Sequence, residues 1–295
     1  RRGALAEFGL RRSNRGSRHD VLVRPTRRAT IAQDILLFGI KAVAAGLLVI
    51  VAAWTAERVG PFWGALVATL PISAGPIYVL LAIDHDKAFV LDAVAGTLAA
   101  LFSTAGFLIC LAKLTHRIGL IASLAVALGF WAVTVYAVDR YVPTDAVVAR
   151  AFAWSIAAMA LGHWMTSPER RIPARLSDGS RWYDVPVRAT LVGLLVATVS
   201  TFSAVVGPAA SGYAAMFPIV MISLSIILRM RLGTEAVSLT MASTFLPLMG
   251  FPISLIAVAA AATRFGIWPS LGFGLLAALA WAALLAWLKL RWQRR

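Results

Sequence analysis

Hydrophobic residues recur along this chain in long runs that are separated by short polar segments. From Ile31 to Leu290, these runs approach the roughly 20 residues that a helix needs to cross a bilayer. Spans are expected near residues 36–56, 61–83, 89–112, 118–139, 146–166, 189–207, 209–229, 236–262 and 267–288. The pattern therefore predicts an all-α, polytopic transmembrane helix bundle of eight or nine spans, with no stretch left over for a separate soluble domain.

Two of these runs share a sequence pattern. GPFWGALVATLP at 60–71 and GPAASGYAAMFP at 207–218 each begin with Gly-Pro and end with a second proline. Pro61 and Pro208 are 208 − 61 = 147 residues apart, and the same offset relates further positions. These pairs include Lys41 with Arg188, Gly46 with Gly193, Thr97 with Thr244, Arg117 with Arg264, Gly119 with Gly266 and Ser123 with Ser270. We therefore expect two repeats of about four spans each.

The expected organisation has four parts. They are a basic tail at 1–30, repeat 1 at 31–139, a linker at 140–186 with an apolar segment and a basic loop, and repeat 2 at 187–295. If the linker segment 146–166 crosses the bilayer, the second repeat is inverted relative to the first, because each repeat has an even number of spans. Hydropathy favours this crossing. The Lys and Arg distribution favours parallel repeats instead, because both halves are biased the same way.

The composition agrees with a membrane protein. The chain is 60% hydrophobic and 14% charged, with a mean hydropathy of +0.81, whereas a soluble domain typically has about 25% charged residues. The net charge of +15 comes from basic residues that flank the spans, above all nine arginines within residues 1–30. This placement predicts a multi-pass membrane protein with a cytoplasmic N-terminus and contacts to anionic headgroups. It argues against nucleic acid as a partner.

Prolines interrupt several of the expected spans. A proline inside a helix removes a backbone hydrogen bond, and broken helices in a membrane tend to line cavities enclosed by protein. Because both repeats contain such breaks, we predict broken helices at the repeat interface that line a substrate path. The candidate residues are Gly60, Pro61, Gly64, Pro71, Ser73, Pro76, Gly207, Pro208, Ser211 and Pro218. The alternative is a pair of kinked, tightly packed helices without a ligand.

Three ionisable residues within or near the spans are candidates for substrate contact or coupling, because charge inside a membrane is costly. They are Lys41, Asp92 and Arg188. Lys41 follows Asp34 by seven residues, so a local ion pair that eases membrane insertion is an alternative for it. Asp92 lies one turn into its span, where simple interfacial solvation is the alternative.

The sequence offers little for catalysis or metal binding. Asp84-His85-Asp86 is interpreted as a solvated turn, because neighbouring residues in a short turn do not easily converge on one ion. Ser200 and Ser203 are expected to bond to their own helix backbone. The single Cys110 permits no intrachain disulfide, and no nucleophile, nucleotide or metal motif is present. We therefore expect no enzyme, no catalytic residue, no metal and no cofactor.

One resemblance rests on Gly212 to Pro218 (GYAAMFP), which is followed by the apolar stretch IVMISLSIIL. This segment resembles the Gly-x4-Phe-Pro hairpin of the small GlpM-like bacterial inner-membrane proteins. The first repeat has Leu70-Pro71 in the corresponding place and departs at the phenylalanine. The resemblance covers one short hairpin per repeat. It implies a bacterial inner-membrane protein built from fused copies of a short unit, and it contributes no catalytic residues.

These patterns lead to one main functional hypothesis. The chain is predicted to be a transporter or a lipid-translocating protein, with a path for a small-molecule or lipid substrate between its two repeats. The alternative is a non-transporting subunit or scaffold of a larger membrane complex, or a homo-oligomer. A water-accessible cavity between the repeats would distinguish the first hypothesis from the second.

Overall fold

In a computed structural model, the chain is described at residues 27–58, 74–141, 148–173 and 184–293. It divides into two units, Arg1–Leu36 and Leu37–Arg295. The described part of the first unit is the beginning of helix α1. All side-chain contacts given below lie within the second unit.

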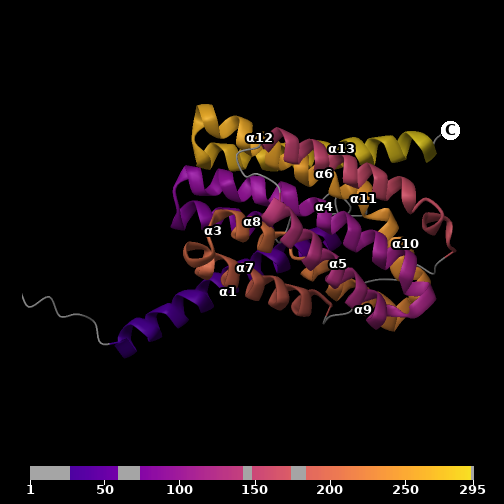
Figure 1. Ribbon diagram of the computed structural model, residues 1–295, viewed down its shortest axis with the longest axis horizontal. Helices are drawn as coiled ribbons and strands as arrows, with labels where there is room; N and C mark the ends of the chain where they lie inside the picture. The colour runs from indigo at the N-terminus through magenta and orange to yellow at the C-terminus, as the bar shows by residue number, and fades with distance from the viewer. Residues whose placement is uncertain (1–26, 59–73, 142–147, 174–183, 294–295) are drawn as a thin grey trace, which may run out of the picture. The chain divides into compact units, whose positions relative to one another are not determined.

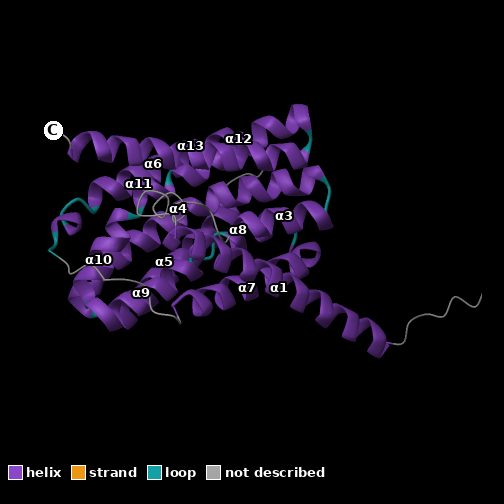
Figure 2. Cartoon of the chain, turned by 180° about the vertical axis from the view of Figure 1, so that it is seen from behind, coloured by secondary structure: helices purple, strands orange, loops and turns teal. Residues whose placement is uncertain are grey.

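The described residues are helical and include no strand, which confirms the all-α prediction (Figures 1 and 2). The helices are α1 (Arg27–Arg58), α3 (Ala74–Asp84), α4 (Lys87–Ile118), α5 (Leu120–Tyr141), α6 (Val148–Met165), the short 3₁₀ helix η1 (Glu169–Arg171), α7 (Asp184–Val206), α8 (Pro208–Ala215), α9 (Ile219–Leu232), α10 (Thr234–Ser243), α11 (Phe245–Leu248), α12 (Gly250–Phe265) and α13 (Ile267–Gln293).

Six helical stretches are long and apolar enough to cross a membrane, which confirms a multi-pass membrane protein. They are Lys87–Ile118, Leu120–Tyr141, Val185–Val206, Pro208–Leu232, Thr234–Phe265 and Ile267–Arg291. Two shorter apolar stretches, Ile35–Leu48 and Ala74–Asp84, lie in α1 and α3. Helix α6 has 18 residues and is therefore about 27 Å long, close to the thickness of the hydrocarbon core.

Helix α4 is the centre of the second unit. It packs against α5, α6, α8 and α10, and 72% of its most apolar stretch is buried inside the protein. Its limits follow from local sequence. The carboxylate of Asp86 accepts a hydrogen bond from Phe89 N at 2.9 Å and caps the first turn. Gly119, with φ of 78°, ends the helix in a conformation that suits glycine.

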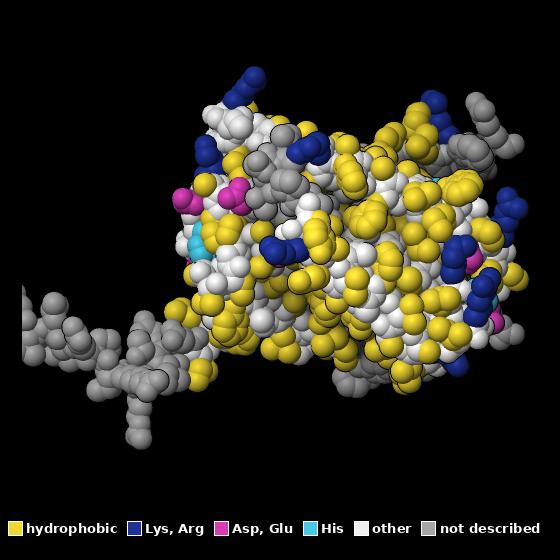
Figure 3. Space-filling view, in the orientation of Figure 1, with side chains coloured by type: hydrophobic (Ala, Val, Ile, Leu, Met, Phe, Trp, Pro, Cys, Tyr) yellow, Lys and Arg dark blue, Asp and Glu magenta, His cyan; other side chains and the backbone are white. Residues whose placement is uncertain are grey.

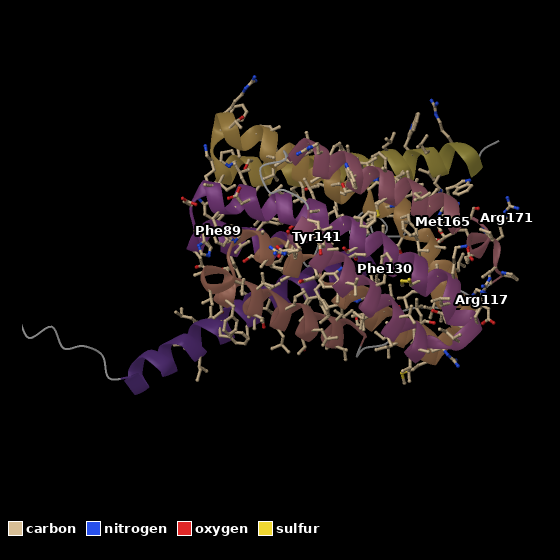
Figure 4. The ribbon with its side chains drawn as sticks, in the orientation of Figure 1. Phe89, Arg117, Phe130, Tyr141, Met165 and Arg171 are labelled. Atoms are coloured by element: carbon tan, nitrogen blue, oxygen red, sulfur yellow. The ribbon has the colours of Figure 1, made fainter. Side chains whose placement is uncertain are left out.

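The two ends of this helix provide a reference for the rest. Phe89 lies near one end of the bundle, and Arg117 lies at the other, together with Arg171 (Figure 4). We call these the Phe89 end and the Arg117 end. Hydrophobic side chains cover much of the face between them, whereas lysine and arginine side chains lie mostly toward the two ends, with more of them at the Arg117 end (Figure 3). This distribution fits a lipid-facing belt with polar margins.

Glycines let α8 approach α4 very closely. A Cβ atom at Gly96 would lie 2.6 Å from the carbonyl oxygen of Ala209, and one at Gly212 would collide with the carbonyl oxygen of Ala93. Small residues at such crossings allow backbone-to-backbone packing, which stabilises helix pairs within membranes. The approach also brings Thr97 of α4 within 2.9 Å of the carbonyl oxygen of Gly212, to which its hydroxyl can donate.

Replacing Gly212 with alanine should therefore destabilise the protein. The added methyl group meets backbone atoms that cannot move aside, so we expect a loss of about 2 kcal/mol in the free energy of unfolding. Gly129→Ala is the matched control, because a Cβ at Gly129 meets nothing within 4 Å. Thermal unfolding in detergent checks both. Equal melting temperatures for Gly212→Ala and the wild type would contradict the packing described.

Candidate functional site

Five polar side chains from three helices and one turn meet at the Phe89 end. We call them the Lys41 cluster: Lys41 of α1, Asp84 at the end of α3, His85 after it, and Ser200 and Ser203 of α7. The Lys41 ammonium lies 2.6 Å from Asp84 Oδ2 and 2.9 Å from Ser200 Oγ. Ser200 in turn donates to Asp84 Oδ2 at 2.9 Å. These three contacts close a triangle that ties α1, α3 and α7 together.

A second contact extends the cluster by one helical turn. His85 Nε2 lies 2.7 Å from Ser203 Oγ, and the imidazole ring stacks on Phe89 with centroids 3.8 Å apart. The Ser203 hydroxyl donates its one proton to the carbonyl oxygen of Ser200 at 2.7 Å. Asp84 and His85, which are consecutive in the chain, thus contact the hydroxyls of Ser200 and Ser203, which are three residues apart on one face of α7.

Burial makes this cluster energetically important. The side chains of Lys41 and Asp84 are 20% and 28% exposed, and Ser200 and Ser203 are almost fully buried. An ammonium and a carboxylate that have lost most of their water are stable only when paired and hydrogen-bonded. The triangle meets this requirement. Among the described residues, the contacts of this triangle use two of the three ammonium protons of Lys41 and Oδ2 of Asp84.

The three predicted ionisable candidates do not lie together. Lys41 belongs to the cluster. Asp92 lies exposed in the second turn of α4, on a different helix from Asp84. Arg188 lies in the first turns of α7, at the opposite end of that helix from Ser200 and Ser203. For Lys41, Asp84 supplies the ion pair that the sequence assigned to Asp34, whose side chain is outside the described part of the chain.

The predicted path residues are only partly described. Gly60, Pro61, Gly64, Pro71 and Ser73 lie outside the described residues. Pro76 lies in the first turn of α3, where a proline is tolerated. Gly207 and Pro208 begin α8, Ser211 is buried within it, and Pro218 lies at the start of α9.

The described break between α8 and α9 lies next to α4 and α5. Helix α8 ends at Ala215, and Met216, Phe217 and Pro218 separate it from α9. The ring of Phe217 meets Trp131 of α5 edge-on, with centroids 5.5 Å apart. One turn before the break, Gly212 O accepts from Thr97, whose hydroxyl also lies 2.5 Å from Tyr78 OH. Helices α8 and α9 are therefore separated at the predicted Pro218, and buried hydroxyls lie beside this break.

A second ion pair lies at the Arg117 end. Lys113 of α4 is 3.5 Å from Glu169 of η1, whose side chain is 8% exposed. The neighbouring Arg170 donates to the carbonyl oxygen of His163 and lies within 3.4 Å of Thr166 Oγ1, so it caps the end of α6. Each end of α4 is thus close to one buried or partly buried ion pair.

Sequence reasoning missed several members of these sites. Asp84 and His85 were interpreted as a solvated turn, but the structure engages both with α7. Ser203 does bond to its own helix backbone, as expected, whereas Ser200 donates to Asp84. The i, i+3 spacing of the two serines was the one available signal. Glu169 carried no signal, since its burial depends on η1 packing beside α10.

Among the described residues, no group of three or more histidine, cysteine and acidic side chains is placed to hold a metal ion. Comparison with protein-family models, with curated proteins and with solved structures found no match for this chain. The resemblance to the GlpM-like proteins therefore stays a prediction, and any functional argument must rest on the geometry itself.

The Lys41–Asp84 pair can be tested by a double-mutant cycle. Lys41→Ala and Asp84→Ala should each destabilise the protein by leaving a partly buried partner unpaired, and the double variant should lose less than the sum. We expect a coupling energy of about 1–2 kcal/mol from unfolding measurements in detergent. The control is a cycle of Lys41→Ala with Asp92→Ala, where independent effects are expected. Additive losses in the first cycle would show that the pair contributes nothing to stability.

Proposed function

We propose that this chain is a membrane transporter or lipid-translocating protein made of two inverted repeats, with a substrate path between them. The observation that carries the proposal is the break at Met216–Pro218 near the middle of Pro208–Leu232, a stretch of span length. Broken spans at the interface of inverted repeats are the usual place for a substrate site in secondary transporters.

The helix limits support the repeats. Helix α4 begins at Lys87 and α10 at Thr234, 234 − 87 = 147 residues apart. Helix α4 ends at Ile118 and α12 at Phe265, which gives the same offset. The glycines that follow, Gly119 and Gly266, both have a φ of 78°. The sequence offset found at the Gly-Pro motifs thus recurs in where helices begin and end.

Reciprocal contacts support a two-fold relation between the repeats. A Cβ at Gly46 would lie 3.3 Å from the carbonyl oxygen of Ala189, and a Cβ at Gly193 would lie 2.5 Å from that of Ala42. Gly46 and Gly193 correspond under the 147-residue offset, and so do Ala42 and Ala189. At the crossing of α1 and α7, a glycine of each helix therefore meets an alanine carbonyl of the other, and the two contacts are equivalent under the offset. The offset also relates α3 to α9 and α5 to α13. Likewise, α3 packs on α13 and α9 packs on α5.

The direction of α6 supports inversion. Phe102 of α4 shares a surface groove with Ala157 of α6, and eleven residues further along α4, Lys113 pairs with Glu169 just after α6. The two helices therefore run in the same direction, so the chain crosses the bundle once between the repeats. Ser238, near the start of α10, donates to the carbonyl oxygen of Ala112 near the end of α4. The equivalent helices α4 and α10–α12 thus run in opposite directions.

Inverted repeats with one intervening span predict that the two chain ends lie on opposite sides of the membrane. Reporter fusions at each end, one active only in the cytoplasm and one only outside it, measure this directly. The arginines of residues 1–30 favour a cytoplasmic N-terminus. The basic residues at the Arg117 end favour a cytoplasmic location for the Arg117 end instead. Both termini on one side would refute the inverted arrangement and restore the parallel one.

Cysteine accessibility tests the path itself. Cys110→Ala leaves a chain without cysteine, because Cys110 is the single one. In that background, cysteines at Ser211, Phe217 and Ser223 should react with a membrane-impermeant maleimide added from either side, because the proposed path alternates between two openings. Val133→Cys on the exposed face of α5 is the lipid-facing control and should stay unmodified, since the reaction needs a hydrated thiolate.

The same labelling distinguishes the alternative function. A scaffold subunit has no water-filled path, so its three break positions should be as unreactive as Val133→Cys. If labelling occurs, the Pro218→Ala variant should slow the exchange of a fluorescent phospholipid between leaflets of proteoliposomes when the substrate is a lipid. Normal exchange by Pro218→Ala, together with labelling, would direct the search to small-molecule substrates.

A further inference from the structure

Two grooves on the lipid-facing surface have the same construction. The first lies between α4 and α6 and is lined by Phe102, Ala153, Trp154, Ala157, Ala158 and Leu161. The second lies along α12 and α13 and is lined by Ala257, Ala260, Ala261, Thr263, Arg264, Phe265 and Phe273. In each, alanines of one helix, which we call the floor, lie beside aromatic rings of the same or the neighbouring helix, and the second groove also includes Thr263 and Arg264.

An exposed arginine stands at one end of each floor. On α6, Arg150 precedes Ala153, Trp154 and Ala157 by three, four and seven residues, so it lies on the groove face. On α12, Arg264 follows Ala261, Ala260 and Ala257 by the same three, four and seven residues and itself lines the groove. Helices α6 and α12, which run in opposite directions, thus each have alanines three and seven residues from an arginine, whereas the position four residues away is Trp154 in α6 and Ala260 in α12.

Both arginines lie toward the Phe89 end. Helix α6 runs parallel to α4 and begins on the side where α4 begins, whereas α12 runs against α4 and ends there. The residues of α6 that line the first groove extend from Ala153 to Leu161, about 12 Å, and those of α12 in the second groove extend from Ala257 to Arg264, about 11 Å, at 1.5 Å per residue. Half of a hydrocarbon core about 30 Å thick is about 15 Å. Each groove is therefore short enough to lie within one leaflet, with its arginine on the side of the Phe89 end.

We propose that each groove binds a phospholipid, with an acyl chain along the alanine floor and the headgroup phosphate on Arg150 or Arg264. The arginine fork donates two parallel hydrogen bonds to phosphate, which suits this headgroup better than a neutral one. Trp154, one turn from Arg150 and 66% exposed, has the amphipathic ring that favours the headgroup level. The two sites occupy the same leaflet.

The positive charge of the arginine at the end of each groove favours a phospholipid over a partner helix. Small residues on an exposed helix face also suit a second protein helix. Such a helix would bury the guanidinium of Arg150 or Arg264 unless it supplied an acid at that depth, whereas phospholipids supply an anion there in every bilayer. The proposal is independent of the transport function, because it concerns the outer surface and not the path between the repeats.

Native mass spectrometry of the purified protein tests the proposal with three added probes: phosphatidylglycerol, diacylglycerol and glycerol phosphate. We expect two phosphatidylglycerol molecules to be retained, and neither diacylglycerol nor glycerol phosphate, since both the phosphate and the acyl chain are needed. Arg150→Gln and Arg264→Gln should each weaken retention at one site about tenfold. The double variant should lose both. Arg117→Gln, at the opposite end, is the matched control and should retain both lipids.

Filling the grooves gives a second, charge-neutral test. Ala157→Leu and Ala260→Leu should each displace one lipid, whereas Ala125→Leu on the exposed face of α5 should displace none. Equal retention of diacylglycerol and phosphatidylglycerol would overturn the proposal. Unchanged lipid retention by the arginine variants would also overturn it. If the groove-filling variants separate a dimer without losing lipid, the grooves belong to a second copy of the chain and the proposal is wrong. Unaltered cysteine labelling of the α8–α9 break in these variants would keep the two proposals separate.

Discussion

The contact on which the rest of this structure depends is the close approach of α4 and α8 at Gly96 and Gly212. Without Cβ atoms at these positions, each backbone meets the carbonyl oxygens of the other helix. In a bilayer no water competes for such contacts, and helices associate through close packing of this kind. Together with α5, α6 and α10, helix α8 buries most of α4.

The same approach pairs polar groups whose burial within a membrane would otherwise be energetically costly. Thr97 can donate to Gly212 O only because the two helices nearly touch, and Tyr78 joins the same hydroxyl from α3. At the Phe89 end, the crossing of α1 and α7 at Gly46 and Gly193 brings Lys41 beside Ser200. Buried polar groups are stable when they are paired, so the small residues that set the helix distances also determine which side chains are paired.

Hydropathy located the described helices well, and packing determined what they contact. The expected span near 89–112 corresponds to α4, and the proline breaks appear between α8 and α9 and around α11. The pairing of Lys41 with Asp84 could not be predicted, because 43 residues separate them and a nearer acid, Asp34, was available. Glu169 was overlooked for a similar reason, since no sequence pattern indicates that a glutamate in a basic loop is buried.

The sequence by itself determined that this is an all-helical, multi-pass membrane protein, because length and hydrophobicity of a run suffice to place a helix across a bilayer. It also located the break at Pro218 between α8 and α9, since proline acts on its own helix. Only the tertiary structure decided the partners of Lys41 and Lys113, the direction of α6 relative to α4, and the grooves that end at Arg150 and Arg264. These features depend on contacts between residues far apart in the chain, and helix periodicity carries no information about which faces meet.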